Sequence, residues 1–393
     1  MKLKDIQSRI IKDSRGEETI EVALTTDYFE VKASVPSGKS KGKYEARVIE
    51  PKAAIKGIGR IETVLCEEGS MRPEHIDKLL ISFKDRIGAN GALALSYAFW
   101  RAAAQDKGIE LYQFIAQEIN KEPKLPRFVL FNLINGGLHA KNSLPFQEYL
   151  LLPRKKLPSE SLAFCFDFLE NLKTKISTLA LSSNIGDEGG FTIESDDAEL
   201  GLKMLKEVLV QNYDAKQSFI GLDVAANSFF KEDHYRIGEK VFLPGALLDF
   251  YDGLAGKYPL LYLEDPFYED GFNEFQKITA KLGEKMWIAG DDLTATNMHR
   301  IKKAKDKNAI NTVIIKPNQI GTVSETIEAA KRAQSYGWKV VVSHRSGETM
   351  DDIIADLAVG LSATGFKAGS PLQPERLVKY KRLVAIENEL TQQ

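Results

Sequence analysis

A series of short apolar runs, each ending in an ionisable residue, is the feature that most constrains the fold of this chain. From Ser218 onward, the runs SFIGLD, PLLYLED, MWIAGDD, TVIIK, KVVVSHRS and GFK alternate with helix-like segments. Their charged ends fall at positions 223, 264, 291, 316, 344 and 367, so successive ends are separated by 41, 27, 25, 28 and 23 residues. This spacing is typical of βα units, in which buried parallel strands are joined by helical crossovers.

Two further apolar runs, FVLFNLI and FQEYLLLP, precede this series and bring the expected number of strands to eight. Eight strands with helical crossovers predict an α/β fold of the (β/α)8 barrel type, whose active site lies at the carboxyl ends of the strands. An open, doubly wound sheet is the alternative, although the sequence has no Gly-rich phosphate loop after its first strand.

The N-terminal part has a different pattern and predicts a smaller α+β domain. The segments IQSRIIKD, TIEVALTT and FEVKASVP alternate in the manner of strands and predict a three-stranded antiparallel meander. Helical periodicity follows up to about residue 120, and the proline-containing KEPKLPR at 121–127 has the composition of a linker. We therefore expect an N-terminal α+β domain over residues 1–122 and a catalytic barrel over residues 123–393.

Composition and charge indicate an ordinary globular protein. The 393 residues are 43% hydrophobic and 27% charged, with a formal net charge of -2, which suggests neither nucleic acid nor a membrane surface as a partner. No apolar run approaches the roughly 20 residues that span a bilayer, and the N-terminal segment lacks the apolar core of a signal peptide. Cys66 and Cys165 are predicted to be buried free thiols in a reducing compartment, so we expect a cytoplasmic enzyme.

Three of the strand ends carry an acid, namely Asp223, Glu264 and Asp291. A carboxylate at the end of a buried strand needs compensation, and Mg²⁺ is commonly held by a few carboxylates together with water and substrate. Each acid alone could instead cap the helix that follows it. Three acids on successive strand ends favour a single magnesium site.

Two other strand ends carry a lysine. Lys316 follows the apolar run TVII, and burial beside a divalent cation would lower its pKa so that it could act as a neutral base. A salt bridge from Lys316 to Asp291 or Glu264 is the alternative. Lys367 follows a shorter run, and we expect it to stay positive and to hold a carboxylate.

Glycine-rich loops carry further candidates. In NIGDEGGF, Glu188 could stay protonated when screened from water and serve as a general acid, whereas the alternative is a helix-capping turn with solvated acids. NGGLHAKNSLPFQE places His139 on a glycine-flanked loop, with Gln147 and Glu148 on the next strand. Glu148 alternates with apolar neighbours, so it is expected to point into the barrel.

Two more segments suggest recognition of a phosphate. SHRSGE offers His344, Arg345 and Ser346 at one strand end, and an arginine with a serine makes a good phosphate clamp. VPSGKSKG is a Gly/Ser loop that leaves the N-terminal sheet. As a lid over the barrel it could bring Ser40 to a cation or a phosphate.

Together these segments resemble the enolase family. The matching pieces are VPSGKSKG, NGGLHA, FQEY, GDEGGF, LDVAA, LEDPF, GDDLT, IKPNQIGT, SHRSGET and FKAGSP, in this order along nearly the whole chain. The resemblance implies a barrel with an unusual ββαα start behind a small α+β domain. It also implies the reversible dehydration of 2-phosphoglycerate to phosphoenolpyruvate in glycolysis, two Mg²⁺ ions per active site, and a homodimer or larger assembly.

The same resemblance assigns roles to individual residues. It implies that Lys316 removes the C2 proton, while Glu188 protonates the leaving hydroxyl with help from Glu148. The metal ligands that it implies are Asp223, Glu264 and Asp291 for the first ion and Ser40 for the second. The residues that it places against the substrate or along the site are Gln147, His139, His344, Arg345, Ser346 and Lys367.

The chain departs from the family pattern at several positions. Lys39 and Lys41 stand in the lid loop where small or neutral residues are usual, and Leu138 stands before His139 where a serine is common. DSRGEE replaces the usual DSRGNP. Ala385 stands where the family often has an arginine that pairs across the dimer with an N-terminal acid, here Glu21.

Two rival functions remain open at this point. An acid-sugar dehydratase or cycloisomerase of the wider superfamily would share the three metal acids, but such enzymes generally lack GDEGGF and SHRSGE together. A non-catalytic binding protein on the same scaffold would be marked by loss of a catalytic residue, and every matched position is filled.

Overall fold

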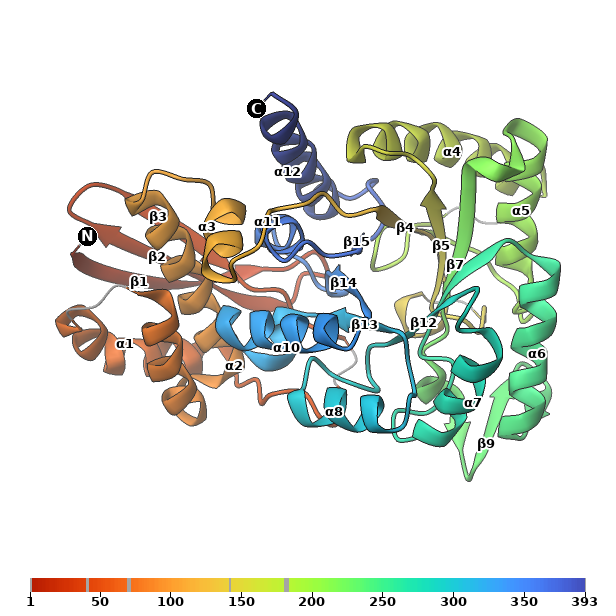
Figure 1. The fold of residues 1–393 in the computed structure, drawn as a ribbon, viewed down its shortest axis with the longest axis horizontal. Helices are drawn as coiled ribbons and strands as arrows, with labels where there is room; N and C mark the ends of the chain where they lie inside the picture. Colours follow the sequence, from red (N-terminus) through yellow and green to blue (C-terminus); the bar gives the residue numbers. More distant parts are fainter. Residues whose placement is uncertain (1, 40–41, 69–71, 141–142, 180–183, 393) are drawn as a thin grey trace.

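The computed structural model describes residues 2–39, 42–68, 72–140, 143–179 and 184–392 (Figure 1). Its N-terminal strands are β1 (Leu3–Lys12), β2 (Glu18–Thr26) and β3 (Glu30–Ser34), which pair antiparallel in the order β1-β2-β3. The predicted meander is therefore confirmed. On β2 the side chains of Ile20, Val22 and Leu24 are fully buried, because alternate residues of a strand point to the same face.

Two helices, α1 (Pro51–Glu67) and α2 (Pro73–Asp106), pack on this sheet, and α3 (Leu111–Glu118) packs against α2 and a barrel helix, α11 (Ile353–Gly360). The α2 helix consists of two parts joined by a kink. At the kink Gly88 has φ 69°, a left-handed conformation that residues with a Cβ rarely adopt. The second half of α2 is almost wholly buried, since it contacts β2 and β3 as well as a barrel helix, α10 (Val323–Ser335).

Within the described residues, eight strands close into a barrel. Their order is β15-β14-β13-β12-β11-β7-β5-β4, and β15 pairs in parallel with β4, which excludes the open doubly wound sheet. The strands are β4 (Phe128–Asn135), β5 (Glu148–Pro153), β7 (Ser218–Asp223), β11 (Leu260–Glu264), β12 (Trp287–Gly290), β13 (Thr312–Ile315), β14 (Lys339–Ser343) and β15 (Gly365–Lys367).

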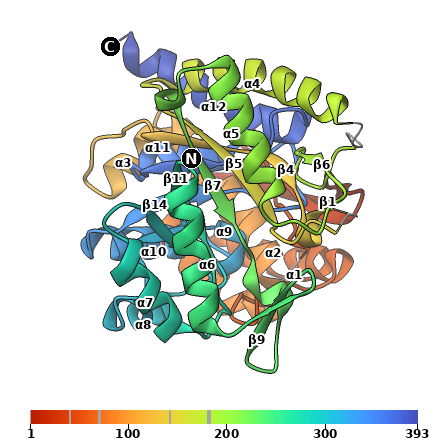
Figure 2. The ribbon, with the colours of Figure 1, turned by 90° about the vertical axis from the view of Figure 1, so that its right-hand side faces the viewer.

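The barrel begins with the implied ββαα arrangement. β5 is antiparallel to both β4 and β7, while the other barrel pairs are parallel. Two helices, α4 (Pro158–Thr178) and α5 (Leu200–Asn212), separate β5 from β7 and cover the outside of the barrel (Figure 2). The other helices of this part are α6 (Pro244–Lys257), α7 (Phe272–Leu282), α8 (Met298–Asp306), α9 (Pro317–Ile320), α11 (Ile353–Gly360) and α12 (Pro374–Thr391).

A small antiparallel sheet of β8 (Phe230–Lys231), β9 (His234–Ile237) and β10 (Lys240–Phe242) is a feature that the sequence reading missed. Its strands are two to four residues long, too short for an alternating pattern to be visible. Together with α6 it fills the long interval between positions 223 and 264. A two-residue strand, β6 (Phe191–Thr192), pairs with β4 beside the barrel.

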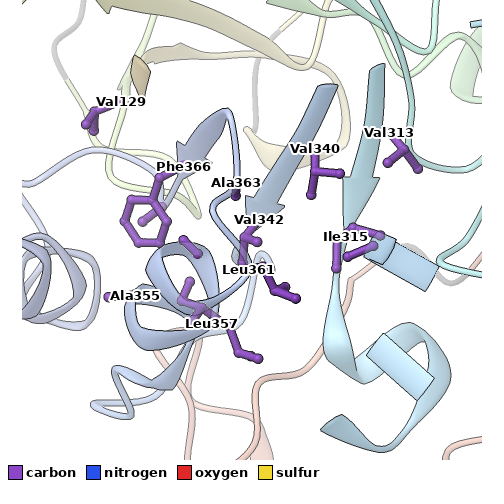
Figure 3. Close-up of a cluster of buried hydrophobic side chains, with 14 of the residues drawn as sticks. Val129, Val313, Ile315, Val340, Val342, Ala355, Leu357, Leu361, Ala363 and Phe366 are labelled. Atoms are coloured by element: carbon purple, nitrogen blue, oxygen red, sulfur yellow. The ribbon is translucent and has the colours of Figure 1, made fainter. Parts of the chain in front are cut away.

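The apolar core has two layers, which are separated by the barrel wall. On β14, Val341 belongs to the cluster inside the barrel, whereas Val340 and Val342 belong to the larger cluster between strands and helices. Figure 3 shows this outer cluster, in which Leu357 of α11 lies near the strand residues. The inner cluster consists of Phe128, Leu130, Leu150, Leu152, Tyr262, Trp287, Ala289, Ile314 and Val341.

Both cysteines carry free thiols, but only Cys165 is buried, and Cys66 is partly exposed. The prediction of two buried thiols is thus half right. Among the described helices, none combines the length and the apolar character that a bilayer crossing requires. Residues 119–127 contain neither helix nor strand, and the domain boundary at residue 122 stays a prediction.

Candidate active site

A cavity at the carboxyl ends of the barrel strands gathers most of the predicted residues. Those that line it are His139, Gln147, Glu188, Asp223, Asp291, Lys316, Arg345 and Ser346. Glu148, Glu264, His344 and Lys367 adjoin it through contacts described below. Ser40 and Lys41 lie outside the described residues.

Lys367 connects two of the three predicted metal acids. Its Nζ lies 2.6 Å from Glu264, 3.2 Å from Asp223 and 3.2 Å from Glu148, and its side chain is only 1% exposed. Burial alone would lower the pKa of Lys367, but the three carboxylates outweigh burial and raise it well above its usual range. Lys367 is therefore positive and holds carboxylates, as the sequence predicts.

The third acid, Asp291, forms an ion pair with Lys316 and accepts a hydrogen bond of 2.9 Å from Gln319 Nε2. Although burial favours a neutral amine, the Asp291 carboxylate outweighs burial and raises the pKa of Lys316. The prediction of a neutral Lys316 assumes a neighbouring cation and stays a prediction, whereas the contact that the structure shows is the salt bridge to Asp291.

The acidic trio fits a hard cation. Among the described residues, Glu264 Oε1 is buried without a hydrogen-bond partner, although Oε2 of the same carboxyl contacts Lys367. Burial and the nearby charge of Asp223 raise the pKa of Glu264 to about 8. A buried carboxylate oxygen without a partner, beside other carboxylate oxygens, is the kind of hard donor that Mg²⁺ prefers.

A second group of acids lies beside the first. Carboxylate oxygens of Asp265, Asp291 and Asp292 lie within 4.8 Å of one another. Asp265 accepts the backbone N–H groups of Asp291 at 3.1 Å and Asp292 at 2.7 Å, so it fixes the turn that presents Asp291. Burial and the charge of Asp291 raise the pKa of Asp292 to about 7. The sequence reading missed Asp265 and Asp292, although both stand next to predicted ligands in LED and GDD.

Glu188, Glu148 and His139 form a close group of three side chains. Their ligand atoms lie within 4.8 Å of one another, and Glu188 lies 3.3 Å from His139 Nδ1 and 3.8 Å from His344 Nε2. Asn132 Nδ2 donates to Glu188 at 2.9 Å. All of these side chains belong to the same buried end of the barrel.

The two carboxyls of this pair differ in their ionisation. Burial would raise the pKa of Glu188, but the neighbouring His139 outweighs burial and lowers it well below its usual range. Burial and the negative charge of Glu188 raise the pKa of Glu148 well above its usual range. The prediction of a protonated Glu188 refers to a site closed over its substrate and stays a prediction; in this structure Glu148 is the carboxyl whose pKa is raised.

Arg345 of the predicted phosphate clamp pairs with Glu45, an acid that the sequence does not single out. Arg345 forms a forked ion pair with Glu45, with N–O distances of 2.9 and 3.0 Å, and donates to Asn318 Oδ1 at 2.9 Å. Glu45 lies just after the lid loop, 300 residues from its partner. Ser346 Oγ accepts a hydrogen bond of 2.9 Å from the backbone N–H of Lys39.

Two departures from the family pattern have visible contacts. Lys39 Nζ lies 2.8 Å from Asp187, so its extra charge joins the lid loop to the loop that carries Glu188. The DSRG part of the variant turn, which the family shares, supports the base of the same lid loop, because Arg15 donates to Ser37 Oγ at 2.8 Å and Asp13 accepts from that hydroxyl. Leu138 is 47% exposed and lines the cavity.

Comparison with known proteins agrees with this geometry. Residues 124–393 match the family model described as enolase, C-terminal TIM barrel domain, and residues 3–115 match the one described as enolase, N-terminal domain. A curated relative, the enolase of Mastigamoeba balamuthi, is 38% identical in an alignment of 421 positions that covers 99% of this chain and 96% of the relative. This chain belongs to the enolase family.

Proposed function

We propose a division of labour for the reaction of this enzyme, the reversible dehydration of 2-phosphoglycerate to phosphoenolpyruvate. The proton beside the substrate carboxylate is weakly acidic, because its removal places a second negative charge on the same group. Two Mg²⁺ ions, the first on Asp223, Glu264 and Asp291 and the second joined by Ser40, would supply the positive charge that stabilises this dianion. Enolase-superfamily sites with a Lys or His base and one or two Mg²⁺ ions are an established pattern.

Lys316 is the proposed base for the C2 proton. It lines the cavity beside Asp291, so its amine is placed next to the metal acids and the substrate carboxylate that they would hold. Its ion pair with Asp291 favours the ammonium form. A cation held by Asp291 would weaken this pair and so favour the neutral amine that a base needs.

Glu188 and Glu148 are the proposed acid pair for the leaving hydroxyl. The close approach of the two carboxyls means that they share protons rather than both ionising, and His139 lies within reach of that exchange. Glu188 lines the cavity and is the proposed donor, while Glu148 is the proposed proton reserve behind it.

The remaining predicted residues are proposed to bind and orient the substrate. Arg345 and Ser346 would hold the phosphate, with the Arg345 fork exchanging Glu45 for phosphate oxygens of the same geometry. Lys367 and Gln147 would contact the substrate near Asp223, to which both lie within 3.5 Å. His139 and His344 line the side of Glu188.

The observation that carries the proposal is the convergence of three metal acids, two lysines and a carboxyl pair on one barrel mouth. We expect the purified protein to form the ultraviolet-absorbing enol phosphate from 2-phosphoglycerate only with Mg²⁺, and to stop when the metal is chelated. Turnover of a sugar acid in place of 2-phosphoglycerate would favour the rival superfamily activity. Binding of 2-phosphoglycerate without any turnover would favour the non-catalytic scaffold.

We further propose a cytoplasmic location and a homodimer, since the family commonly assembles in pairs. The domain boundary between residues 122 and 123 belongs to the same set of proposals. The net charge is near zero, so it gives no reason to propose nucleic acid or a membrane surface as a partner.

A further inference from the structure

Arg376, in the first turn of α12, is a fully buried guanidinium that none of the roles above uses. A guanidinium has five N–H donors and no acceptor, and here five uncharged acceptors surround it. They are His344 Nδ1 at 2.5 Å, the backbone carbonyl of Arg345, those of Ser346 at 2.7 Å and Asp187 at 3.1 Å, and Gln373 Oε1 at 3.3 Å. Arg376 therefore links the strand end of His344 to the loop of Glu188.

The contact with His344 determines where that imidazole carries its proton. Since Arg376 can only donate, Nδ1 of His344 must offer its lone pair, and a neutral ring then has its hydrogen on Nε2. Nε2 is the nitrogen that faces Glu188, at 3.8 Å. Burial lowers the pKa of His344 well below its usual range, and the charge of Arg376 lowers it further, which keeps the ring neutral despite Glu188.

We propose that Arg376 is a positioning residue that locks His344 in the Nε2–H tautomer and aims that N–H at Glu188. The inference rests on the proposed role of Glu188 in the dehydration. In the direction of water loss, a neutral Nε2–H donor beside Glu188 orients this carboxyl without taking the proton that it must deliver. No other described side chain donates a hydrogen bond to His344 Nδ1.

The backbone approaches the His344 ring closely at Gly369. Gly369 has φ 84°, and a Cβ on it would lie 3.0 Å from His344 Cε1, 3.0 Å from Arg376 Cδ and 2.8 Å from the Glu188 carbonyl oxygen. A glycine is therefore required where these three groups meet. Arg376 also anchors the Glu188 loop directly, through the Asp187 carbonyl.

Nuclear magnetic resonance on protein labelled with ¹⁵N-histidine tests the tautomer without reference to turnover. The chain has five histidines, so the ring ¹⁵N signals of His344 can be assigned by comparison with a His344→Gln sample. We expect the wild-type ring to show a protonated Nε2 and an unprotonated Nδ1. A proton on Nδ1 in the wild type would overturn the proposal, whatever the protein catalyses.

Two variants then test the cause. Arg376→Met removes the donor, and Arg376→Lys keeps the charge but loses the fork, so both are expected to give mixed tautomers of His344. Arg382→Met is the matched control, because Arg382 is a largely buried arginine of the same helix that pairs with Asp356 instead of the site. If either folded Arg376 variant kept a pure Nε2–H tautomer, Arg376 would not be its cause.

Kinetics provide the second readout. Outer hydrogen-bond partners of a site histidine commonly matter by about 10- to 100-fold, and we expect a fall of this order in kcat for Arg376→Met with KM nearly unchanged. Loss of the neighbouring positive charge lets His344 accept a proton at higher pH, so the acid limb of kcat should move to higher pH. In Arg376→Lys, which keeps the charge, the acid limb of kcat should not move. An unshifted acid limb in Arg376→Met would contradict the positioning role of Arg376. Absence of wild-type turnover would refute the proposed function but leave the tautomer result standing.

Discussion

Lys367 is the buried positive charge that pairs with several carboxylates of this site. With its ammonium within 3.2 Å of Glu148, Asp223 and Glu264, it neutralises a group of carboxylates that could not otherwise be buried together. Lys316 does the same for Asp291. The acids and the lysines at the strand ends therefore compensate one another's charge.

Glu264→Gln is expected to weaken Mg²⁺ binding by about 10-fold or more. The substitution keeps the size of a side chain with a buried, unpartnered oxygen but removes the charge that the cation requires. Calorimetric titration of the protein with Mg²⁺ measures the change. Glu269→Gln is the matched control, because Glu269 is also buried with an unpartnered oxygen but is not one of the carboxylates that pair with Lys367. Equal weakening by both substitutions would contradict the assignment.

The sequence predicts the identity of the site residues better than their ionisation. Strand ends could be read from apolar runs, so the acids and lysines were found. The partner of Arg345 could not be predicted, because Glu45 is 300 residues away and no local pattern marks the pair. The ionisation of Lys316 and Glu188 could not be predicted from sequence, because it depends on which charges the fold brings within a few ångströms.

At the level of elements, the lid loop and the loop of Glu188 are joined by an exposed ion pair. The side chains of Lys39 and Asp187 are 42% and 28% exposed, and exposed pairs contribute about 0–1 kcal/mol. We expect Lys39→Ala and Asp187→Asn each to change kcat/KM by no more than about fivefold, less at high salt.

A double-mutant cycle measures this coupling. The double variant should behave like either single variant, because each alone removes the pair. Lys43→Ala, in the same segment, is the control, since its ammonium lies over the Tyr44 ring rather than at Asp187. Additive effects of the two substitutions would show that the loops are not coupled through this contact.

Asp77 joins helix α2 to the start of helix α10, and it predicts a pH dependence of stability. Its carboxylate accepts from Trp100 Nε1 at 3.0 Å and from the Ser324 backbone and hydroxyl at 2.8 and 2.6 Å, yet burial raises its pKa. The folded state therefore binds this proton more tightly than the unfolded state. Stability from Asp77 is full below about pH 3.9 and is lost as pH rises through the raised value.

Asp77→Asn removes this titration. Urea denaturation measures the unfolding free energy of both proteins. Between pH 4 and neutral pH, the unfolding free energy of the wild type should decrease relative to that of Asp77→Asn. A difference that rises with pH would mean that the hydrogen bonds outweigh burial.

At the scale of the whole molecule, closure of β15 on β4 brings residues from all parts of the barrel to one mouth. The regular spacing of strand ends predicts this architecture, and the antiparallel β5 followed from family resemblance rather than spacing. The small sheet of β8, β9 and β10 could not be predicted, since its strands are too short to show a period.

The proposed homodimer should have twice the chain mass of 43.9 kDa in light scattering. In this structure Glu21 pairs with Arg9 of its own sheet, at 2.5 Å, and Ala385 offers no charge to it. Glu21→Ala should therefore leave the dimer intact. Dissociation of that variant would show that Glu21 still contributes to the interface, and a monomeric wild type would refute the dimer.

Exchange of the C2 proton of 2-phosphoglycerate with D₂O, followed by proton NMR in the presence of Mg²⁺, tests the central claim most directly. Wild type should exchange the proton and lose water, Glu188→Gln should exchange without forming phosphoenolpyruvate, and Lys316→Ala should do neither, with a loss of about 100-fold or more. Lys339→Ala, at the opposite end of the barrel, should match the wild type. Exchange by Lys316→Ala at a near-wild-type rate would contradict the account.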